Sequence, residues 1–482
     1  MRIIRRLNPR NLRIRDRWFA GAIALFLLSV PAVTPRLHAS DEIEYFAYLR
    51  SVWFDGDLSF DNEYRYFYDR GTARAWGFEK TFLGQTTATG LRPNYAPIGT
   101  ALLWAPFYAI ADLGTRIAAA AGSTVPVDGY SRPYLVAITY ASAIYGFLAV
   151  LISVVVIRTV LGAGRVAALA VCAGTPLIFY MYVAPGFSHA CSAFAVAAFV
   201  LVWLRVRRDW TVGGIMALGA MAALMGMVRE QDVFLAAGPA IDYGATMMRA
   251  SRDGLDGVRP LIGKAFAGII AFVICYIPQA AAYVILNGRI APDPAIEQKM
   301  FWSSPHALRV LFSPSHGVVF WTPLFVLAVV GLILLAAGRD AGNRPETGSD
   351  ARWIGLVMLV MVASQIYVSG SVNTWSAAGS FGQRRLVGLT VFLSVGLAVL
   401  LRNRPTGAAS LALPLLVIAC VWWNLGLIAQ FGSGTMNRQR LELSRNTYNN
   451  FVLIPRSLPG LTYRYLFHRS SFYKSARTDI AP

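Results

Sequence analysis

Three carboxylates that could do chemistry follow the first long apolar segment of this 482-residue chain. Asp41, Glu42 and Glu44 come shortly after residues 18–35, which are long and apolar enough to cross a membrane. On a helix, Asp41 and Glu44 lie on one face. A carboxylate held where the membrane meets water could act as a general base toward a hydroxyl group. The structural alternative is that Asp41 caps a helix and Glu44 completes a capping box.

Basic side chains that could bind a phosphate group occur farther along the chain. Arg384 and Arg385 begin an apolar segment, Arg229 lies in a polar turn, and Lys299 and His316 lie in a long polar loop. An arginine donates two hydrogen bonds to a phosphate at once. Fixed cations also stabilise a phosphate leaving group as its charge grows. Interfacial anchoring of the arginine pair, and an ion pair of Arg229 with a neighbouring acid, are the structural alternatives.

Four further residues could line a cleft next to these groups. Tyr95 and Pro97 lie in RPNYAPIG, His189 lies at the outer end of an apolar segment, and Trp375 lies in WSAAGSFGQRRL. The first segment returns to the membrane surface after the acidic stretch, so it could form a wall. The structural alternatives are a helix start at Pro97 and an interfacial histidine whose hydrogen bonds are satisfied.

The composition is that of a protein embedded in a membrane. Apolar residues make up 56% of the chain and charged residues 14%, whereas about a quarter of the residues are charged in soluble proteins. The amino-terminal region also resembles a signal peptide with a cleavage site at LHAS, so removal is an alternative to a permanent first span. All four cysteines lie in apolar segments, without metal-ligand spacing or a disulfide framework.

We expect eleven transmembrane helices with the amino terminus inside, at residues 18–35, 133–157, 166–183, 187–204, 211–228, 231–248, 262–287, 317–337, 353–370, 385–401 and 407–429. The inner segments then carry 21 Lys and Arg and the short outer loops carry 6, which agrees with the positive-inside rule. A further span at 97–121 would reverse every later loop. Asp112 and Arg116 within that segment favour an interfacial helix instead.

This topology predicts a transmembrane domain, residues 1–430, followed by a short basic outer tail, residues 431–482. Residues 36–132 form a large outer loop with interfacial helices, and this loop holds 11 of the 25 acids. The tail carries eight bases and two acids, which suits contact with anionic lipid headgroups. Because the net charge of +19 is distributed by topology, we expect no nucleic-acid partner.

Five motifs in this order resemble those of the C-type (GT-C) glycosyltransferases. These are integral membrane enzymes that use polyprenyl-phosphate sugars and include the protein O-mannosyltransferases and the lipid A aminoarabinose transferases. The motifs are Asp41-Glu42, Tyr95-Ala96-Pro97-Ile98-Gly99, GFSHACSAF (186–194), SPSHGVVFWTPL (313–324) and WSAAGSFGQRRL (375–386). The resemblance covers residues 10–430 and implies an all-α bundle of about 11 spans with an outer catalytic loop. Ala96 and Gln383 depart from it, because the family has proline at both positions.

The resemblance implies a role for each group of candidates. Asp41 would deprotonate the acceptor hydroxyl, with inversion at the anomeric carbon, and Glu42 or Glu44 would support it or help hold a divalent metal. Arg384 would bind the donor phosphate. The implied partners are a polyprenyl-phosphate-linked sugar, a lipid, glycan or protein acceptor, and membrane lipids. The implied location is the bacterial cytoplasmic membrane, with the site facing the periplasm or the cell exterior.

Two other classes of protein remain as alternatives. A transporter or lipid flippase without glycosyl transfer predicts ionisable residues near the middle of the membrane and often repeated halves. Most predicted spans lack such charges, and Asp242 is the main exception. A noncatalytic assembly protein with the same fold is the second alternative. The sequence leaves the sugar, the acceptor and the metal open.

Overall fold

The computed structural model describes residues 17–72, 77–162, 164–339, 348–377, 379–404 and 407–474. The basic inner segment predicted at 1–17 lies almost wholly outside these ranges, as does much of the inner loop 338–352. The described chain consists of helices and loops, with a single isolated bridge between Met300 and Val372 and no strand. The prediction of an all-α fold is therefore confirmed.

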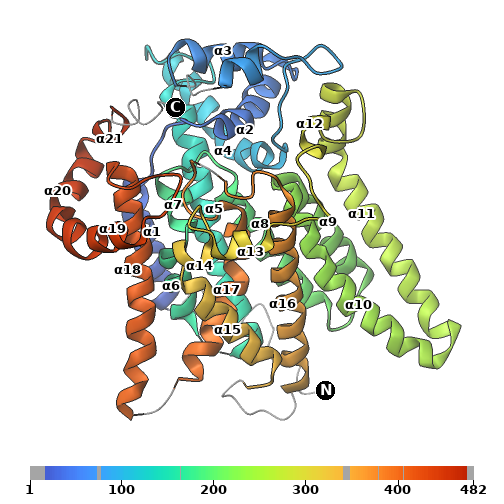
Figure 1. Cartoon of the computed structure of the whole chain (residues 1–482). Coiled ribbons are helices and arrows are strands. Elements are labelled where there is room, and N and C mark those ends of the chain that lie inside the picture. The colour runs from blue at the N-terminus through green and yellow to red at the C-terminus, as the bar shows by residue number, and fades with distance from the viewer. Residues whose placement is uncertain are drawn as a thin grey trace.

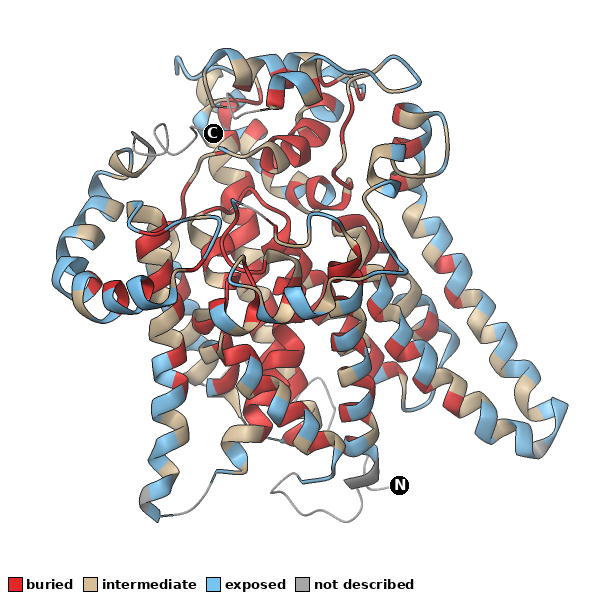
Figure 2. Ribbon diagram, in the orientation of Figure 1, coloured by how far each residue is buried: buried red, intermediate tan, exposed pale blue. Residues whose placement is uncertain are grey.

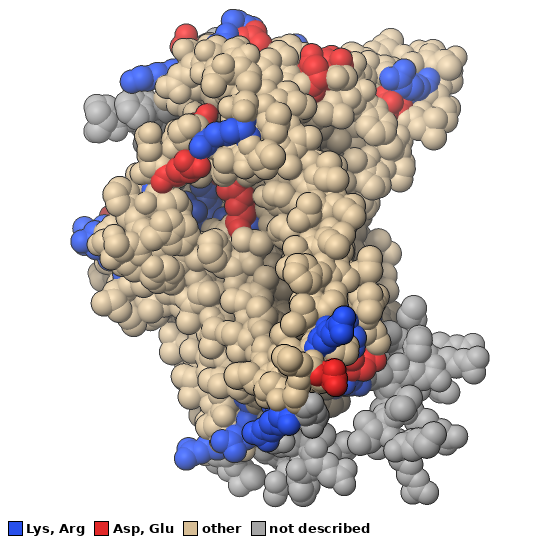
Figure 3. Space-filling view, turned by 90° about the vertical axis from the view of Figure 1, so that its right-hand side faces the viewer, with Lys and Arg blue, Asp and Glu red and all other residues tan. Residues whose placement is uncertain are grey.

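Six helical segments are long and apolar enough to cross a membrane. They are α5 (Arg132–Leu161), α8 (His189–Val206), α11 (Leu255–Asn287), α16 (Gly348–Ser371), η8 (Arg384–Leu389) continued by α17 (Thr390–Arg402), and α18 (Ala412–Ser433). Charged side chains gather toward the two ends of the molecule on the face in Figure 3, and an uncharged band lies between them. The chain thus has the features of a polytopic membrane protein.

Four shorter apolar helices coincide with further predicted spans. They are α1 (Arg17–Ser29), α6 (Arg165–Gly174), α9 (Val212–Val228) and α15 (Leu324–Ala336).

Three predicted spans are interrupted. Residues 166–183 divide into α6 and α7 (Leu177–Tyr182), residues 317–337 divide into α14 (Val318–Trp321) and α15, and residues 231–248 begin as the 3-10 segment η6 (Glu230–Ala236) before α10 (Ala237–Ala250).

Small residues let the central helices approach each other closely. A Cβ atom at Gly331 of α15 would lie 1.7 Å from the carbonyl oxygen of Gly396 in α17, and one at Gly219 of α9 would lie 2.1 Å from that of Gly268 in α11. In lipid, the hydrophobic effect does not favour contact between helices, so their association depends on close van der Waals packing of this kind. Figure 2 shows the buried residues concentrated in the centre, while much of α11 is exposed. The exposed apolar face of α11 is therefore suited to lipid.

The predicted outer loop forms a helical cap at one end of the bundle (Figure 1). It contains α2 (Ser40–Arg50), the π-helix η4 (Ser51–Asp55), α3 (Asp61–Asp69), the π-helix η5 (Glu79–Leu83) and α4 (Gly99–Ala120). Helix α4 covers the segment expected to be interfacial. Its Asp112 accepts hydrogen bonds from Tyr134 at 2.8 Å and Trp53 at 3.2 Å and pairs with Arg116 at 2.9 Å. The polar face of α4 is thereby turned toward the cap and α5.

The carboxyl-terminal segment folds back as helices instead of trailing from the bundle. After α18 come α19 (Leu443–Tyr448), the π-helix η10 (Asn449–Leu453), α20 (Ile454–Phe467) and α21 (Ser471–Lys474). Tyr465 donates a hydrogen bond to the carbonyl of Ala32 at 2.9 Å, and Arg469 donates to those of Val33 at 2.7 Å and Pro31 at 2.9 Å. These bonds fasten the tail beside α1 (Figure 1).

Candidate active site

The fold brings Asp41 and Arg384 into direct contact. Asp41 is the second residue of α2, Arg384 is the first residue of η8, and Asp41 Oδ2 lies 2.8 Å from Arg384 Nη1. The side chain of Asp41 is 38% exposed and that of Arg384 is 20% exposed, so a ligand can reach both. The predicted base and the predicted phosphate ligand therefore share one site.

Glu42, and not Asp41, satisfies the start of α2. Glu42 Oε2 accepts hydrogen bonds from the backbone N–H groups of His38 at 2.7 Å and Ala39 at 3.0 Å. Its side chain is fully buried, and a Cβ atom at Gly186 would lie 2.8 Å from Glu42 Oε1. The capping interpretation for Asp41 and Glu44 is thus wrong, because Ala39 is the N-cap and Glu42 supplies the capping carboxylate. Glu42 positions the helix that carries Asp41.

Glu44 joins α2 to the predicted cleft wall. Glu44 Oε1 accepts a hydrogen bond from the Tyr95 N–H at 2.7 Å, and the Glu44 carbonyl accepts one from Asn94 Nδ2 at 3.0 Å. Burial, and then the negative charge of Asp41, raises the pKa of Glu44 to about 8. Lys299 Nζ lies 5.4 Å from the centre of the Tyr95 ring. Pro97 is buried just before α4, whose N-cap is Ile98.

Arg229 belongs to a hydrogen-bonded group beside this pair. Its Nη1 lies 2.8 Å from His189 Nδ1, and its Nη2 donates to Gln231 Oε1 at 3.1 Å. Gln231 Nε2 in turn donates to the carbonyl of Arg385 at 2.7 Å. This amide connects η6 to η8 and was not recognised in the sequence, because a lone glutamine carries no pattern. The predicted phosphate ligand Arg229 and the predicted cleft-wall residue His189 are therefore fixed near Arg384.

The site has an excess of positive charge. Burial alone would raise the pKa of Asp41, but the charges of Arg384, Arg229 and Arg385 together hold that pKa below its ordinary value. Three guanidinium groups act on the Asp41 carboxylate, Asp232 faces one of them, Arg229, and Glu44, with its raised pKa, is largely protonated at neutral pH. Such a site favours an anionic ligand.

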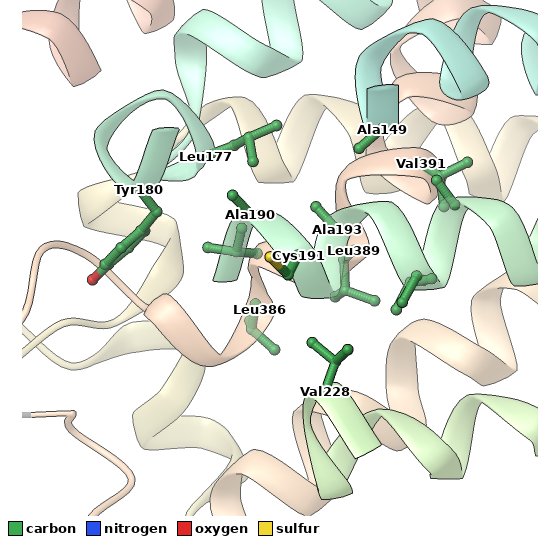
Figure 4. Packing of buried hydrophobic residues seen from close by; sticks show 14 of the residues in the cluster. Ala149, Leu177, Tyr180, Ala190, Cys191, Ala193, Val228, Leu386, Leu389 and Val391 are labelled. Atoms are coloured by element: carbon green, nitrogen blue, oxygen red, sulfur yellow. The ribbon is translucent and has the colours of Figure 1, made fainter. Parts of the chain in front are cut away.

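Apolar packing behind η8 fixes the position of Arg384. Figure 4 shows Ala190, Cys191 and Ala193 of α8 facing Leu386 and Leu389 of η8. All five side chains are buried. The small residues on α8 leave room for the two leucines of η8. This packing holds η8 against α8, and Arg384 at the start of η8 then contacts Asp41 of α2.

Two predicted residues lie in the loops around the site in structural positions. His316 is fully buried with φ of 65°, its ring lies 4.6 Å from that of Trp321, and no described residue hydrogen-bonds either ring nitrogen. Burial lowers the pKa of His316 to about 4, so it offers no positive charge at neutral pH. The Trp375 carbonyl accepts a hydrogen bond from Gln383 Nε2 at 3.1 Å, and Arg309 lies 5.9 Å from the Trp375 ring.

A large groove opens next to the Asp41–Arg384 pair. Its cavity volume is about 2380 Å³, and it lies among α1, α7, α18 and the carboxyl-terminal helices. One part of its wall is apolar and includes Trp18, Leu25, Phe26, Phe147, Leu169 and Ile428, and another is polar and basic and includes Arg36, His38, Ser40, Asn437, Arg438 and Arg469. Ser40 precedes Asp41 in α2. The groove therefore reaches the residue before Asp41, although neither Asp41 nor Arg384 lines it.

The donor set suits an anion better than a metal cation. Within the described ranges, no group of three His, Cys, Asp or Glu side chains is placed to hold a metal ion. Glu42 and Glu44 accept backbone hydrogen bonds, and Asp41 pairs with Arg384. The charged neighbours of Asp41 are arginines, which would repel a divalent cation.

No protein-family model, curated protein or solved structure matches this chain.

Proposed function

We propose that the chain is an inverting glycosyltransferase of the GT-C type, with eleven spans and its site on the outer face of the bacterial cytoplasmic membrane. The observation that carries the proposal is the Asp41–Arg384 pair at 2.8 Å beside the 2380 Å³ groove. This arrangement supports the proposal, because a general base and a phosphate ligand of such an enzyme have to lie together where a lipid and an aqueous acceptor can both arrive. The donor is a polyprenyl-phosphate-linked sugar.

The groove supplies the two environments that such a donor needs. The polyprenyl chain occupies the part lined by Trp18, Leu25 and Phe147, because burial of apolar surface favours association. The phosphate lies toward Arg36 and Arg438 on the polar rim, and from there it extends past Ser40 toward Arg384, which lies outside the groove lining. The acceptor hydroxyl comes from the aqueous side above Asp41.

Transfer moves negative charge from Asp41 to the phosphate. Asp41 takes the proton of the acceptor hydroxyl, and the oxygen of that hydroxyl forms a bond to the anomeric carbon. The bond from the anomeric carbon to the phosphate oxygen breaks at the same time. The electron pair of the broken bond stays on the lipid phosphate, which goes from one negative charge to two. Since Asp41 becomes neutral in the same step, the total charge facing the three arginines is unchanged, and the fixed cations stabilise the transition state without reorganisation.

The remaining residues position this machinery. Glu42 fixes the start of α2, and Glu44 holds the Tyr95 segment. Arg229, which is held by its hydrogen bond with His189, contributes positive charge. Because no ligand set for a divalent cation surrounds Asp41, we assign no step to a metal ion.

The transporter alternative loses its main support at Asp242. This carboxylate accepts hydrogen bonds from Arg207 Nε at 2.7 Å, Trp203 Nε1 at 3.0 Å and Trp353 Nε1 at 2.7 Å. A carboxylate with its acceptor positions occupied by three donors holds α8, α10 and α16 together and is poorly suited to bind a transported ion.

Purified protein in lipid nanodiscs, supplied with a panel of polyprenyl-phosphate sugars, tests the proposal by release of polyprenyl phosphate. Asp41→Asn should reduce transfer at least about 100-fold, because it removes a general base. Asp61→Asn is the matched control, since Asp61 is equally exposed at 38% and pairs with Arg65 and Arg92 in the same cap. Full transfer by Asp41→Asn would refute the assignment, and failure of the wild type with every donor would favour the noncatalytic alternative.

A further inference from the structure

The Asp41–Arg384 ion pair occupies the group that is proposed to bind the donor phosphate. Asp41 is the sole polar partner of the Arg384 side chain among the described residues. Arg229 and Arg385, in contrast, hold other partners, His189 at 2.8 Å and Thr374 Oγ1 at 3.0 Å respectively. Of the three arginines around Asp41, Arg384 is therefore the one that has the Asp41 carboxylate as its hydrogen-bonding partner.

We propose that this ion pair is a closed state of the site, and that a phosphate ester opens it by displacing the Asp41 carboxylate from Arg384. This inference rests on the proposed function and adds a regulatory step to it. With the site empty, the carboxylate is held by its partner and is a weak base. With phosphate on Arg384, the carboxylate is released at the moment when a donor is present.

The geometry allows the exchange to occur without movement of the helices. Arg384 also lies 5.3 Å from the centre of the Phe187 ring, a cation–π contact that keeps the guanidinium in place when its carboxylate partner leaves. Asp41 is at the start of α2, and its side chain, 38% exposed, already borders solvent into which a rotamer change could turn it.

The charges also favour a second anion in the site. The ionisable groups around Asp41 are Arg384 and Arg385 from η8, Arg229 from the end of α9, Tyr180 from α7, and Glu44 and Tyr45 from α2 itself, and Asp232 of η6 faces Arg229. Glu44, with a pKa raised to about 8, and Tyr45, with a pKa raised to about 12 mainly by burial, are largely neutral at pH 7. The three guanidinium groups then outnumber the carboxylates of Asp41 and Asp232, and this excess of positive charge favours an anionic phosphate ester.

Binding of farnesyl phosphate in detergent, measured by calorimetry at pH 7, tests the exchange. The conformational cost of opening the pair lowers the apparent affinity of the wild type, so Asp41→Asn should bind about tenfold more tightly. Asp61→Asn makes the same change in net charge and should bind like the wild type. Inorganic phosphate and farnesol, measured alone, separate binding of the headgroup from binding of the chain.

A double-mutant cycle shows whether Arg384 carries the effect. Arg384→Gln should weaken binding, and in that background Asp41→Asn should give no gain. Unchanged or weaker binding by Asp41→Asn, or a gain that persists without Arg384, would overturn the inference. If Asp41→Asn loses transfer but binds no more tightly, the inference fails and the proposed function stands. If it keeps transfer, the proposed function fails.

Thermal unfolding of each variant checks that it is folded. Should Asp41→Asn not fold, the wild type provides the second measurement. Release from Arg384 raises the pKa of Asp41 toward its ordinary value, so binding near pH 4 should take up protons. This uptake is measured as a dependence of the binding enthalpy on the ionisation enthalpy of the buffer. Binding without proton uptake under those conditions also overturns the exchange.

Discussion

Replacement of Glu44 by glutamine should make the protein more stable, and the gain should depend on pH. Glu44 is 6% exposed, and burial is the main cause that raises its pKa to about 8 from the ordinary value of 4.5. The native state therefore keeps a proton that the unfolded state has already lost. Between pH 4.5 and pH 8, stability falls as pH rises.

The size of the effect follows from the difference between these two pKa values. Each pKa unit corresponds to about 1.4 kcal/mol, so the loss should approach about 5 kcal/mol above pH 8. Glutamine resembles the protonated acid and can still accept the Tyr95 N–H hydrogen bond, which is 2.7 Å long in the wild type. It carries no charge that burial could penalise.

Thermal unfolding followed by tryptophan fluorescence provides the measurement. The difference in Tm between Glu44→Gln and the wild type should be small at pH 5, grow through pH 7 and level off near pH 9. Glu297→Gln is the control, because Glu297 is 53% exposed in a surface pair with Arg289 and should follow the wild type. A Tm difference that stays constant from pH 5 to pH 9 would show that Glu44 keeps an ordinary pKa in the folded protein.

Three further predictions concern the bundle and its tail. Gly396→Ala should lower Tm markedly, because its Cβ would lie 2.0 Å from the Ala328 carbonyl oxygen, whereas Gly263→Ala, with open space around its Cβ, should be neutral or stabilising. Asp242→Asn should cost about 3 kcal/mol, because it removes the buried carboxylate that Arg207 Nε contacts at 2.7 Å and leaves Arg207 only the exposed Asp350 as a partner, measured as a lower midpoint of denaturation. Arg469→Ala should speed chymotrypsin cleavage of the tail, because two bonds to the chain after α1 are lost, and an unchanged cleavage rate would show that Tyr465 alone holds it.

The candidates at the site were recognisable because their chemistry is concentrated in short segments. Asp41 follows a long apolar run, and Arg384 begins one, so the predicted topology puts both on the same side of the membrane. The capping alternative was wrong because capping depends on backbone dihedrals, and Ala39, with φ of −115° and ψ of 153°, takes the N-cap position. The groove could not be predicted, since its wall combines residues as distant as Trp18 and Phe472.

The interruptions of the predicted spans, unlike the groove, had a sequence signal. Residues 166–183 and 317–337 each break at a threonine followed by proline, Thr175-Pro176 and Thr322-Pro323. A residue before proline avoids the α region, and Thr175 has φ of −130° and ψ of 167°. Hydrophobicity over a long window hides such breaks, because the apolar side chains continue through them.

These breaks help to build the site. The first produces α7, whose Tyr180 donates a hydrogen bond to the Phe381 carbonyl at 3.1 Å and so fixes the loop that leads to Arg384. The second produces α14, whose Trp321 stacks on His316. Non-helical backbone at membrane depth is tolerated where it is buried in protein or lines a cavity. The two prolines therefore interrupt two predicted spans. The short helices α7 and α14 that result contact the loops around Arg384 and His316.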